Sequence, residues 1–178
     1  MPSAKTHDAI TFMLAVPAAA AAYAATRHLS AAVIVGLAFL FGGLMFGPDL
    51  DTVSRQYSRW GIFRFLWLPY RSFFKHRSHF SHGLILGALL RVFYFAGAVT
   101  LVVFCAAYVY ASYTGGRLPR LNDISLVWGP IGAFVNAYFG GSEFYLLSFV
   151  GVWLGAASHT FTDLAGSFVK TGRVSKFL

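Results

Sequence analysis

Four long apolar stretches, at residues 9–26, 31–47, 83–112 and 143–163, dominate the pattern of hydrophobic and polar positions along the chain. An α-helix needs about 20 apolar residues to cross a bilayer, so each stretch is able to span a membrane, the first two barely. The third would be roughly 45 Å long as a helix and should tilt or project from the bilayer. The pattern predicts an all-α fold: a polytopic membrane helix bundle with about four spans, in one membrane domain over residues 1–178.

Cations and aromatic residues alternate between the second and third apolar stretches. The cations are Arg55, Arg59, Arg64, Arg71, Lys75 and Arg77, and the aromatic residues include Trp60, Phe63, Trp67, Tyr70 and Phe73. This mixture is typical of a segment at the headgroup level, so we expect an interfacial helix or loop here. A further segment, 124–139, is apolar but short and is broken by Gly129-Pro130, which favours a re-entrant or interfacial piece.

The composition supports a membrane protein and narrows its partners. Charged residues make up 11% of the chain and hydrophobic residues 57%, whereas an average soluble domain has about 25% charged residues. The net charge of +8 is compatible with nucleic-acid binding. The cations lie beside apolar segments, however, so we expect anionic lipid headgroups as partners and no nucleic acid. Cys105 is the single cysteine, so it cannot form an intrachain disulfide.

The distribution of cations predicts the orientation. Lys5 and the apolar run after it resemble a secretory signal, but His7 and Asp8 precede the run and a second apolar run follows, which favours an uncleaved first helix. With four spans, ten cations fall on one side and three on the other, with Arg91 inside a helix. The positive-inside rule then predicts a multi-pass protein of the inner (cytoplasmic) membrane with both termini in the cytoplasm.

Nine of the twelve acidic residues and histidines gather on the predicted cytoplasmic face. They are His7, Asp8, Asp49, Asp51, His76, His79, His82, His159 and Asp163. Taken singly, each motif has an ordinary explanation: an exposed pair on a helix, a helix stop, or a headgroup-binding loop. Because ionisable groups near a membrane are costly, their convergence from four distant segments favours function instead.

The local spacing of these residues suits metal binding. His159 and Asp163 are four residues apart, so they share one face of a helix. Asp49 and Asp51 follow Pro48, where the second helix should end. Imidazole and carboxylate groups without thiolates favour zinc, manganese or iron, and the donors suffice for two divalent ions. We expect Asp8 and His79 to be neighbours of the site and not ligands.

Two further features have structural explanations. Arg91 follows His82 by nine residues, so it faces away from it on a helix, and we expect its side chain to snorkel to the interface. The glycines Gly42, Gly43 and Gly47 are expected to allow close helix packing.

Several motifs resemble an uncharacterised bacterial family, frequent in cyanobacteria, of metal-binding membrane proteins. They are "MPSAKTHDAIT", "FGGLMFGPDLDTVSRQY", "LWLPYR", "HRSHFSHG" and "SHTFTDL", and they are spread over nearly the whole chain. More distantly, the layout is similar to that of inner-membrane metal-dependent hydrolases. The positions that match their motifs are His7, Asp49, Asp51, Ser54, His76, Arg77, Ser81, His82, His159 and Asp163. This chain differs by one extra residue between His76 and His82.

These observations lead to an expected function. We expect a metal-dependent hydrolase that acts on a lipid or phosphoester substrate at the cytoplasmic membrane face. The expected metal ligands are His7, Asp49, Asp51, His82, His159 and Asp163. His76 is expected to be a ligand or general base and Arg77 to clamp the charge of the substrate. The alternatives are a non-catalytic metal carrier or metal-dependent membrane scaffold and, resting on the basic segment alone, an adaptor for nucleic acid or a regulatory protein.

Overall fold

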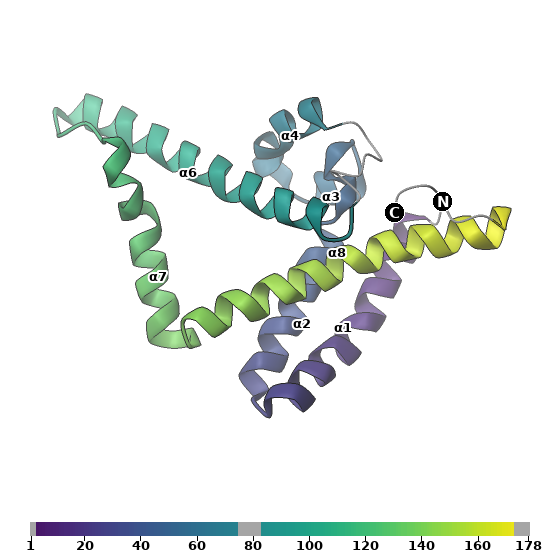
Figure 1. Ribbon diagram of the computed structural model, residues 1–178. Coiled ribbons are helices and arrows are strands. Elements are labelled where there is room, and N and C mark those ends of the chain that lie inside the picture. The colour runs from purple at the N-terminus through teal and green to yellow at the C-terminus, as the bar shows by residue number, and fades with distance from the viewer. Residues whose placement is uncertain (1–2, 75–82, 173–178) are drawn as a thin grey trace.

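The computed structural model describes residues 3–74 and 83–172, and over these residues it confirms an all-helical fold (Figure 1). The α-helices are α1 (Ala4–Thr26), α2 (Leu29–Leu44), α3 (Arg55–Ser58), α4 (Leu68–Phe73), α6 (Leu86–Thr114), α7 (Ser125–Phe139) and α8 (Ser142–Thr171). Short 3-10 helices are η1 (Pro48–Asp51), η2 (Gly61–Trp67) and η3 (Leu121–Ile124).

Four helical segments are long and apolar enough to cross a membrane. They are Ala4–Thr26, Leu29–Asp51, Leu86–Thr114 and Ser142–Lys170, and they correspond to the four apolar stretches of the sequence. The first helix begins before its apolar stretch because the Ser3 hydroxyl caps it, accepting a hydrogen bond from the backbone N–H of Thr6 at 3.2 Å. The cap extends the helix so that it includes His7.

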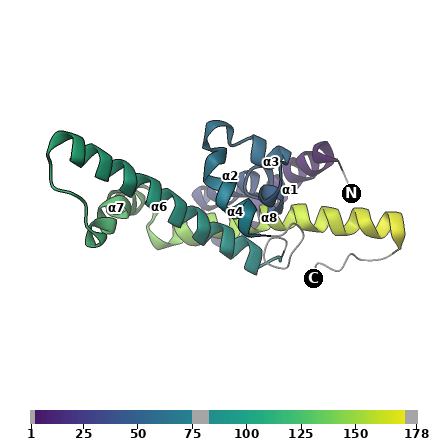
Figure 2. The same cartoon turned by 90° about the horizontal axis from the view of Figure 1, so that it is seen from above.

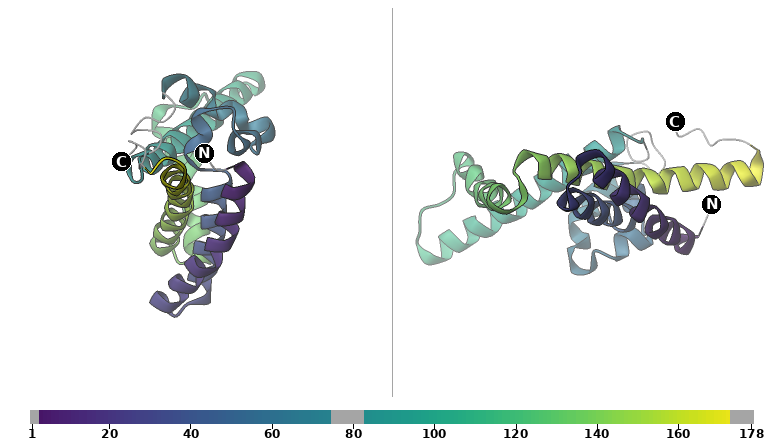
Figure 3. Two further views of the ribbon diagram at one scale, coloured as in Figure 1. Left: turned by 90° about the vertical axis from the view of Figure 1, so that its right-hand side faces the viewer. Right: turned by 90° about the horizontal axis from the view of Figure 1, so that it is seen from below.

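The helices α1, α2 and α8 pack together and form the part of the fold that carries the polar cluster. α1 and α2 are an antiparallel hairpin, and α8 crosses α2 while running in the same direction (Figure 1). The start of α1 lies beside the C-terminal half of α8, as Figure 3 also shows. The helices α6 and α7 extend away to one side of this group, which is clearest from above (Figure 2).

Glycines allow the backbones of α8 and α2 to come into direct contact. The sequence predicts such close helix packing at Gly42 and Gly43. A Cβ atom at Gly42 would overlap the backbone of Val152, and one at Gly43 would overlap the side chain of Thr11 in α1. On α8, a Cβ at Gly155 would overlap the carbonyl oxygen of Phe39. The third predicted glycine, Gly47, lies against the side chain of Gln56.

The aromatic residues of the basic segment form a second core, which corrects part of the interfacial prediction. Trp67 and Tyr70 are fully buried. The Trp67 ring stacks on Phe95 of α6 with 5.7 Å between ring centroids, and the Tyr94 hydroxyl donates to the carbonyl of Leu66. These rings therefore pack against α6, because burying them removes more apolar surface from water than a headgroup position would. Phe63 stays exposed and remains available to an interface.

The segment 124–139 is a continuous helix, so the predicted break at Gly129-Pro130 is wrong. α7 runs through Pro130 to Phe139. A proline inside a helix removes one backbone hydrogen bond and crowds the preceding turn, and such prolines are tolerated in membrane helices. The loop before α7 is held by Asp123, whose carboxylate accepts from the backbone N–H of Arg120 and from the Arg117 guanidinium. The Arg120 N–H and then the two cations hold the pKa of Asp123 below its usual value.

Candidate metal centre

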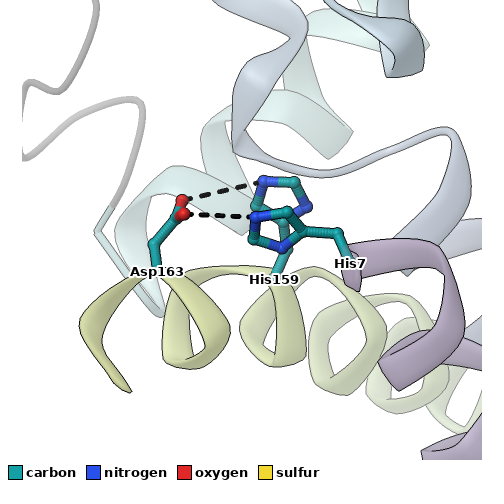
Figure 4. A group of neighbouring side chains, drawn as sticks. All are labelled: His7, His159 and Asp163. Carbon is teal, nitrogen blue, oxygen red and sulfur yellow. Dashed lines mark ion pairs between the residues drawn. The ribbon is translucent and has the colours of Figure 1, made fainter. Parts of the chain in front are cut away.

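Three buried side chains from the two ends of the chain meet between α1 and α8 (Figure 4). His7 Nε2 lies 3.2 Å from Asp163 Oδ1, and His159 Nε2 lies 3.8 Å from Asp163 Oδ2. The rings of His7 and His159 stack with their centroids 3.8 Å apart. One donor atom from each of the three residues falls within 4.8 Å of the others. This group is called the His/Asp triad below.

The elements place the triad through local spacing and through one close helix contact. His159 and Asp163 are one turn apart on α8, as the sequence predicts, and both point toward α1 (Figure 4). His7 lies in the second turn of α1, whose Thr11 packs against Gly43 of α2. The small residues of α2 thus bring α1 and α8 together at the level of the histidines.

Asp49 extends the triad from the end of the second apolar segment. Its Oδ2 atom lies 3.2 Å from His159 Nε2. Asp49 lies in the 3-10 turn that begins at Pro48, so the chain leaves α2 and directs this carboxylate back to α8. The sequence predicts this residue in the site, and the structure places it next to the triad.

Gln56 positions two groups of the site through hydrogen bonds, and the sequence pattern did not predict this role. It is 4% exposed. Its Nε2 donates to the carbonyl of Gly43 at 2.8 Å and lies 3.2 Å from His159 Nδ1, while its Oε1 accepts from the backbone N–H of Asp49 at 3.2 Å. One amide therefore fixes the His159 ring and the backbone of Asp49. A single glutamine in a basic segment has no spacing that reveals such a role.

A cavity of about 230 Å³ opens onto the triad and has a charged wall. Asp8 lines it and pairs with Arg59 at 2.6 Å and with Arg55 at 3.2 Å. Arg59 also donates to the carbonyl of Leu44 at 2.8 Å. Asp8 thus offsets one of the two positive charges of these arginines, and the three side chains together keep a net positive charge. Ser54, which caps α3, lines the same cavity.

Asp51 lies in a second buried polar group together with Arg91 and Tyr70. Arg91 is 2% exposed, so the prediction that it snorkels to the interface is wrong. Its charge interacts with the Tyr70 hydroxyl and with Asp51 and Asp49, and these partners offset the cost of burying it. Burial raises the pKa of Tyr70, and the guanidinium of Arg91 opposes that effect.

Four residues of the expected site lie outside the described residues. His76 and Arg77, with their expected catalytic roles, and the expected ligand His82 belong to the segment 75–82, as does His79. Their roles remain predictions from the sequence.

The donor atoms of the triad fit a divalent cation. His159 Nε2 and both carboxylate oxygens of Asp163 are buried and have no hydrogen-bond partner among the described residues; their polar contacts are the ion pairs within the triad and with Asp49. Buried polar groups normally have such partners, and a buried carboxylate is costly without compensation. A cation held by two imidazoles and a carboxylate would supply it, and these donors suit zinc, manganese or iron.

Comparisons with known proteins agree with a metal site. The family model described as "Uncharacterized metal-binding protein (DUF2227)" matches residues 2–173. A protein of Aquifex aeolicus (strain VF5), described as "Uncharacterized protein", is 38% identical over 60 residues, which is 33% of this chain. The aligned part spans 42% of the length of that relative. No solved structure matches the chain.

Proposed function

Because this chain belongs to the family of uncharacterized metal-binding proteins, we propose that it is a membrane-embedded, metal-dependent hydrolase. Its substrate would be a lipid or phosphoester at the cytoplasmic face of the inner membrane. One observation carries the proposal: the cavity lined by the buried His/Asp triad is also lined by Arg55, Arg59 and Ser54. Cation-binding groups and anion-binding groups thus share one cavity, as hydrolysis of a phosphoester requires.

The residues divide into ligands and supporting groups. His7, His159 and Asp163 are the proposed ligands of the first ion, with Asp49 completing the set from beside His159. Asp51 and His82 remain proposed ligands from the sequence, and with them the chain has donors for a second ion. When bound, the cation would act as a Lewis acid and lower the pKa of water at the site.

Charged groups of the basic segment would bind the substrate. Arg77 is the proposed clamp on an anionic group, and His76 the proposed general base or further ligand. Arg55 and Arg59 line the cavity, and Asp8 tempers their charge. Anionic lipid headgroups would be held by the cations of the basic segment.

Metal analysis tests the first half of the proposal. His7→Ala, His159→Ala and Asp163→Asn should each lose most of the bound metal, because the remaining donors cannot satisfy the cation. His28→Ala is the matched control and should keep the metal, since His28 lies at the start of α2, far from the triad. The measurement is elemental analysis of detergent-purified protein. Equal metal content in all four variants would contradict the triad as a metal site.

Turnover tests the second half. Arg77→Ala should keep the metal and lose most hydrolysis of lipid or phosphoester substrates, and Arg77→Lys should restore only part, because lysine lacks the planar fork. Arg64→Ala, an exposed cation of the same segment, should leave turnover unchanged. If the metal-loaded wild type hydrolyses none of a panel of such substrates, the hydrolase proposal fails and the metal-carrier alternative takes its place.

A further inference from the structure

A long apolar groove runs between α1 and α8 and ends beside the His/Asp triad. Its volume is about 710 Å³, within the ~300–1,000 Å³ range of ligand pockets. Ile10, Leu14 and Pro17 form the α1 wall, and α8 contributes residues such as Leu154 and Phe161. Within the described part of the chain, the groove shares no lining residue with the polar cavity, which His7 lines.

The groove exists because α1 and α8 both pack on α2 while diverging from each other. Polar contacts join them at one end, where His7 meets Asp163. Farther along, Phe39 of α2 lies between them and is 4% exposed. The hydroxyls on the α8 wall bond within their own helix: Ser158 donates to Gly155 and Thr162 donates to Ser158. The α8 wall therefore offers neither of these two hydroxyls as a free donor to an occupant of the groove.

The two ends of the groove differ in polarity. Thr6 and Lys170 line the end near the triad, and Pro17 and Leu154 line the far end. Thr6 is next to His7 in the sequence, and Thr162 is next to Asp163. An occupant that extends along the groove thus has its polar end at the triad and beside a lysine ammonium.

The geometry points to the acyl chain of an anionic phospholipid as the occupant, with its phosphate headgroup at Thr6 and Lys170. This inference rests on the proposed function and narrows it, because it makes the substrate a membrane lipid. The walls belong to two helices that are able to cross a membrane, where an occupant must have no unsatisfied polar groups along its length. A chain of methylene groups meets that condition, and the cation at one end complements an anionic headgroup.

The length of the groove suits a single acyl chain. The α1 wall from Thr6 to Pro17 is about 16 Å long. An unbranched chain of methylene groups can lie along the whole of this wall.

Photolabelling of the full chain tests the inference. The protein is reconstituted in vesicles of equal parts phosphatidylcholine and phosphatidylglycerol, with a phosphatidylglycerol probe that carries a diazirine at the end of one acyl chain. Labelled peptides are identified by mass spectrometry. We expect labelling of the groove, at Leu14, Pro17 and Leu154, to exceed labelling of the exposed surface of α6, at Tyr108 and Val109, several-fold. Uniform labelling of both surfaces would overturn the inference.

Filling the groove provides the matched variant. Ala165 is an exposed residue that lines the groove, so Ala165→Phe should reduce groove labelling several-fold with unchanged metal content. The control is Ala107→Phe, at an exposed alanine of α6, which should leave groove labelling as in the wild type. If Ala165→Phe does not fold, Leu14→Trp on the opposite wall makes the same test. Groove labelling that survives the filled groove would overturn the inference.

Two more measurements test where the headgroup binds and whether the occupant is a lipid. Unlabelled phosphatidylglycerol should compete better than phosphatidylcholine, and Lys170→Gln should remove that preference; a preference that persists would overturn the placement of the headgroup. Photo-crosslinks between two copies through α1 and α8 would overturn the inference in favour of a dimer. Hydrolysis is scored separately: groove labelling without turnover refutes the hydrolase and leaves lipid binding intact.

Discussion

Gln56 is the residue on which the local geometry of the triad depends. Its single amide binds the Gly43 carbonyl, the Asp49 N–H and the His159 ring, so it ties α2, the turn after it and α8 to one another. Groups that orient a metal-binding histidine commonly contribute 10–100-fold to metal affinity. The neighbouring pairs of Asp8 with Arg55 and Arg59 are more exposed and contribute less.

We expect Gln56→Leu to weaken metal binding by about 10–100-fold, because an apolar side chain can neither bind the Gly43 carbonyl nor orient the His159 ring. It should also lower the free energy of unfolding by about 1–3 kcal/mol, since the buried Gly43 carbonyl loses its donor. Competition with a fluorescent chelator measures the affinity. Ser58→Ala, on the same short helix but exposed, is the control. Wild-type affinity in Gln56→Leu would show that the amide does not orient the site.

At the scale of elements, the crossing of α2 and α8 decides whether the triad forms. Gly42 and Gly155 lie where the two backbones touch, with Val152 and Phe39 as the opposing residues. Helices in membranes associate through such small residues, because apolar side chains gain little by leaving lipid. A shift of this crossing by one side chain would move His159 away from His7.

Gly155→Ala should lower the free energy of unfolding by about 1–3 kcal/mol, although alanine usually stabilises a helix relative to glycine, because the added Cβ would overlap the Phe39 carbonyl. It should also lower bound metal by displacing α8. Gly97→Ala is the control: Gly97 is a helical glycine of α6 with nothing within 4 Å of the added Cβ, so alanine should stabilise it slightly. Unfolding in detergent and elemental analysis measure both effects. If both substitutions changed stability and bound metal equally, the close contact of α2 and α8 at Gly155 would be contradicted.

At the scale of the whole molecule, the triad constrains the topology. His7 lies near the start of α1 and Asp163 near the end of α8, and the two side chains are in contact. If the four candidate segments all cross the membrane, these two ends lie on the same side of it. The helix α7 has 15 residues and would be about 22 Å long, shorter than the ~30 Å hydrocarbon core.

Reporter fusions should place the segment after α8 and the segment 54–75 in the cytoplasm, and the loop near Arg117 on the opposite side. The physical reason is the excess of cations at the first two sites, which the positive-inside rule keeps in the cytoplasm. Alkaline phosphatase and green fluorescent protein fusions measure the two sides. A C-terminal fusion on the far side would mean that α7 also crosses, and the contact between His7 and Asp163 would then be incompatible with the membrane.

The helices and the common face of His159 and Asp163 on α8 could be predicted from the order of residues alone. Long apolar runs specify helices whatever they pack against, so the four predicted stretches coincide with the candidate spans to within seven residues at each end. The i, i+4 spacing of His159 and Asp163 fixes their common face, since it depends only on helix geometry. Cap and turn chemistry also acts locally, which is why Asp49 after Pro48 is found at the end of α2.

Which groups from distant parts of the chain meet could not be predicted from local patterns. Gln56 beside His159, Asp8 beside Arg59 and the buried Arg91 all depend on how helices cross, and no local pattern encodes those crossings. The same is true of Trp67, whose aromatic and basic neighbours indicate an interface although the ring is buried against α6. Burial in these cases follows from contacts between segments far apart in the chain. The free energies of such contacts depend on one another, so they cannot be assigned to single residues.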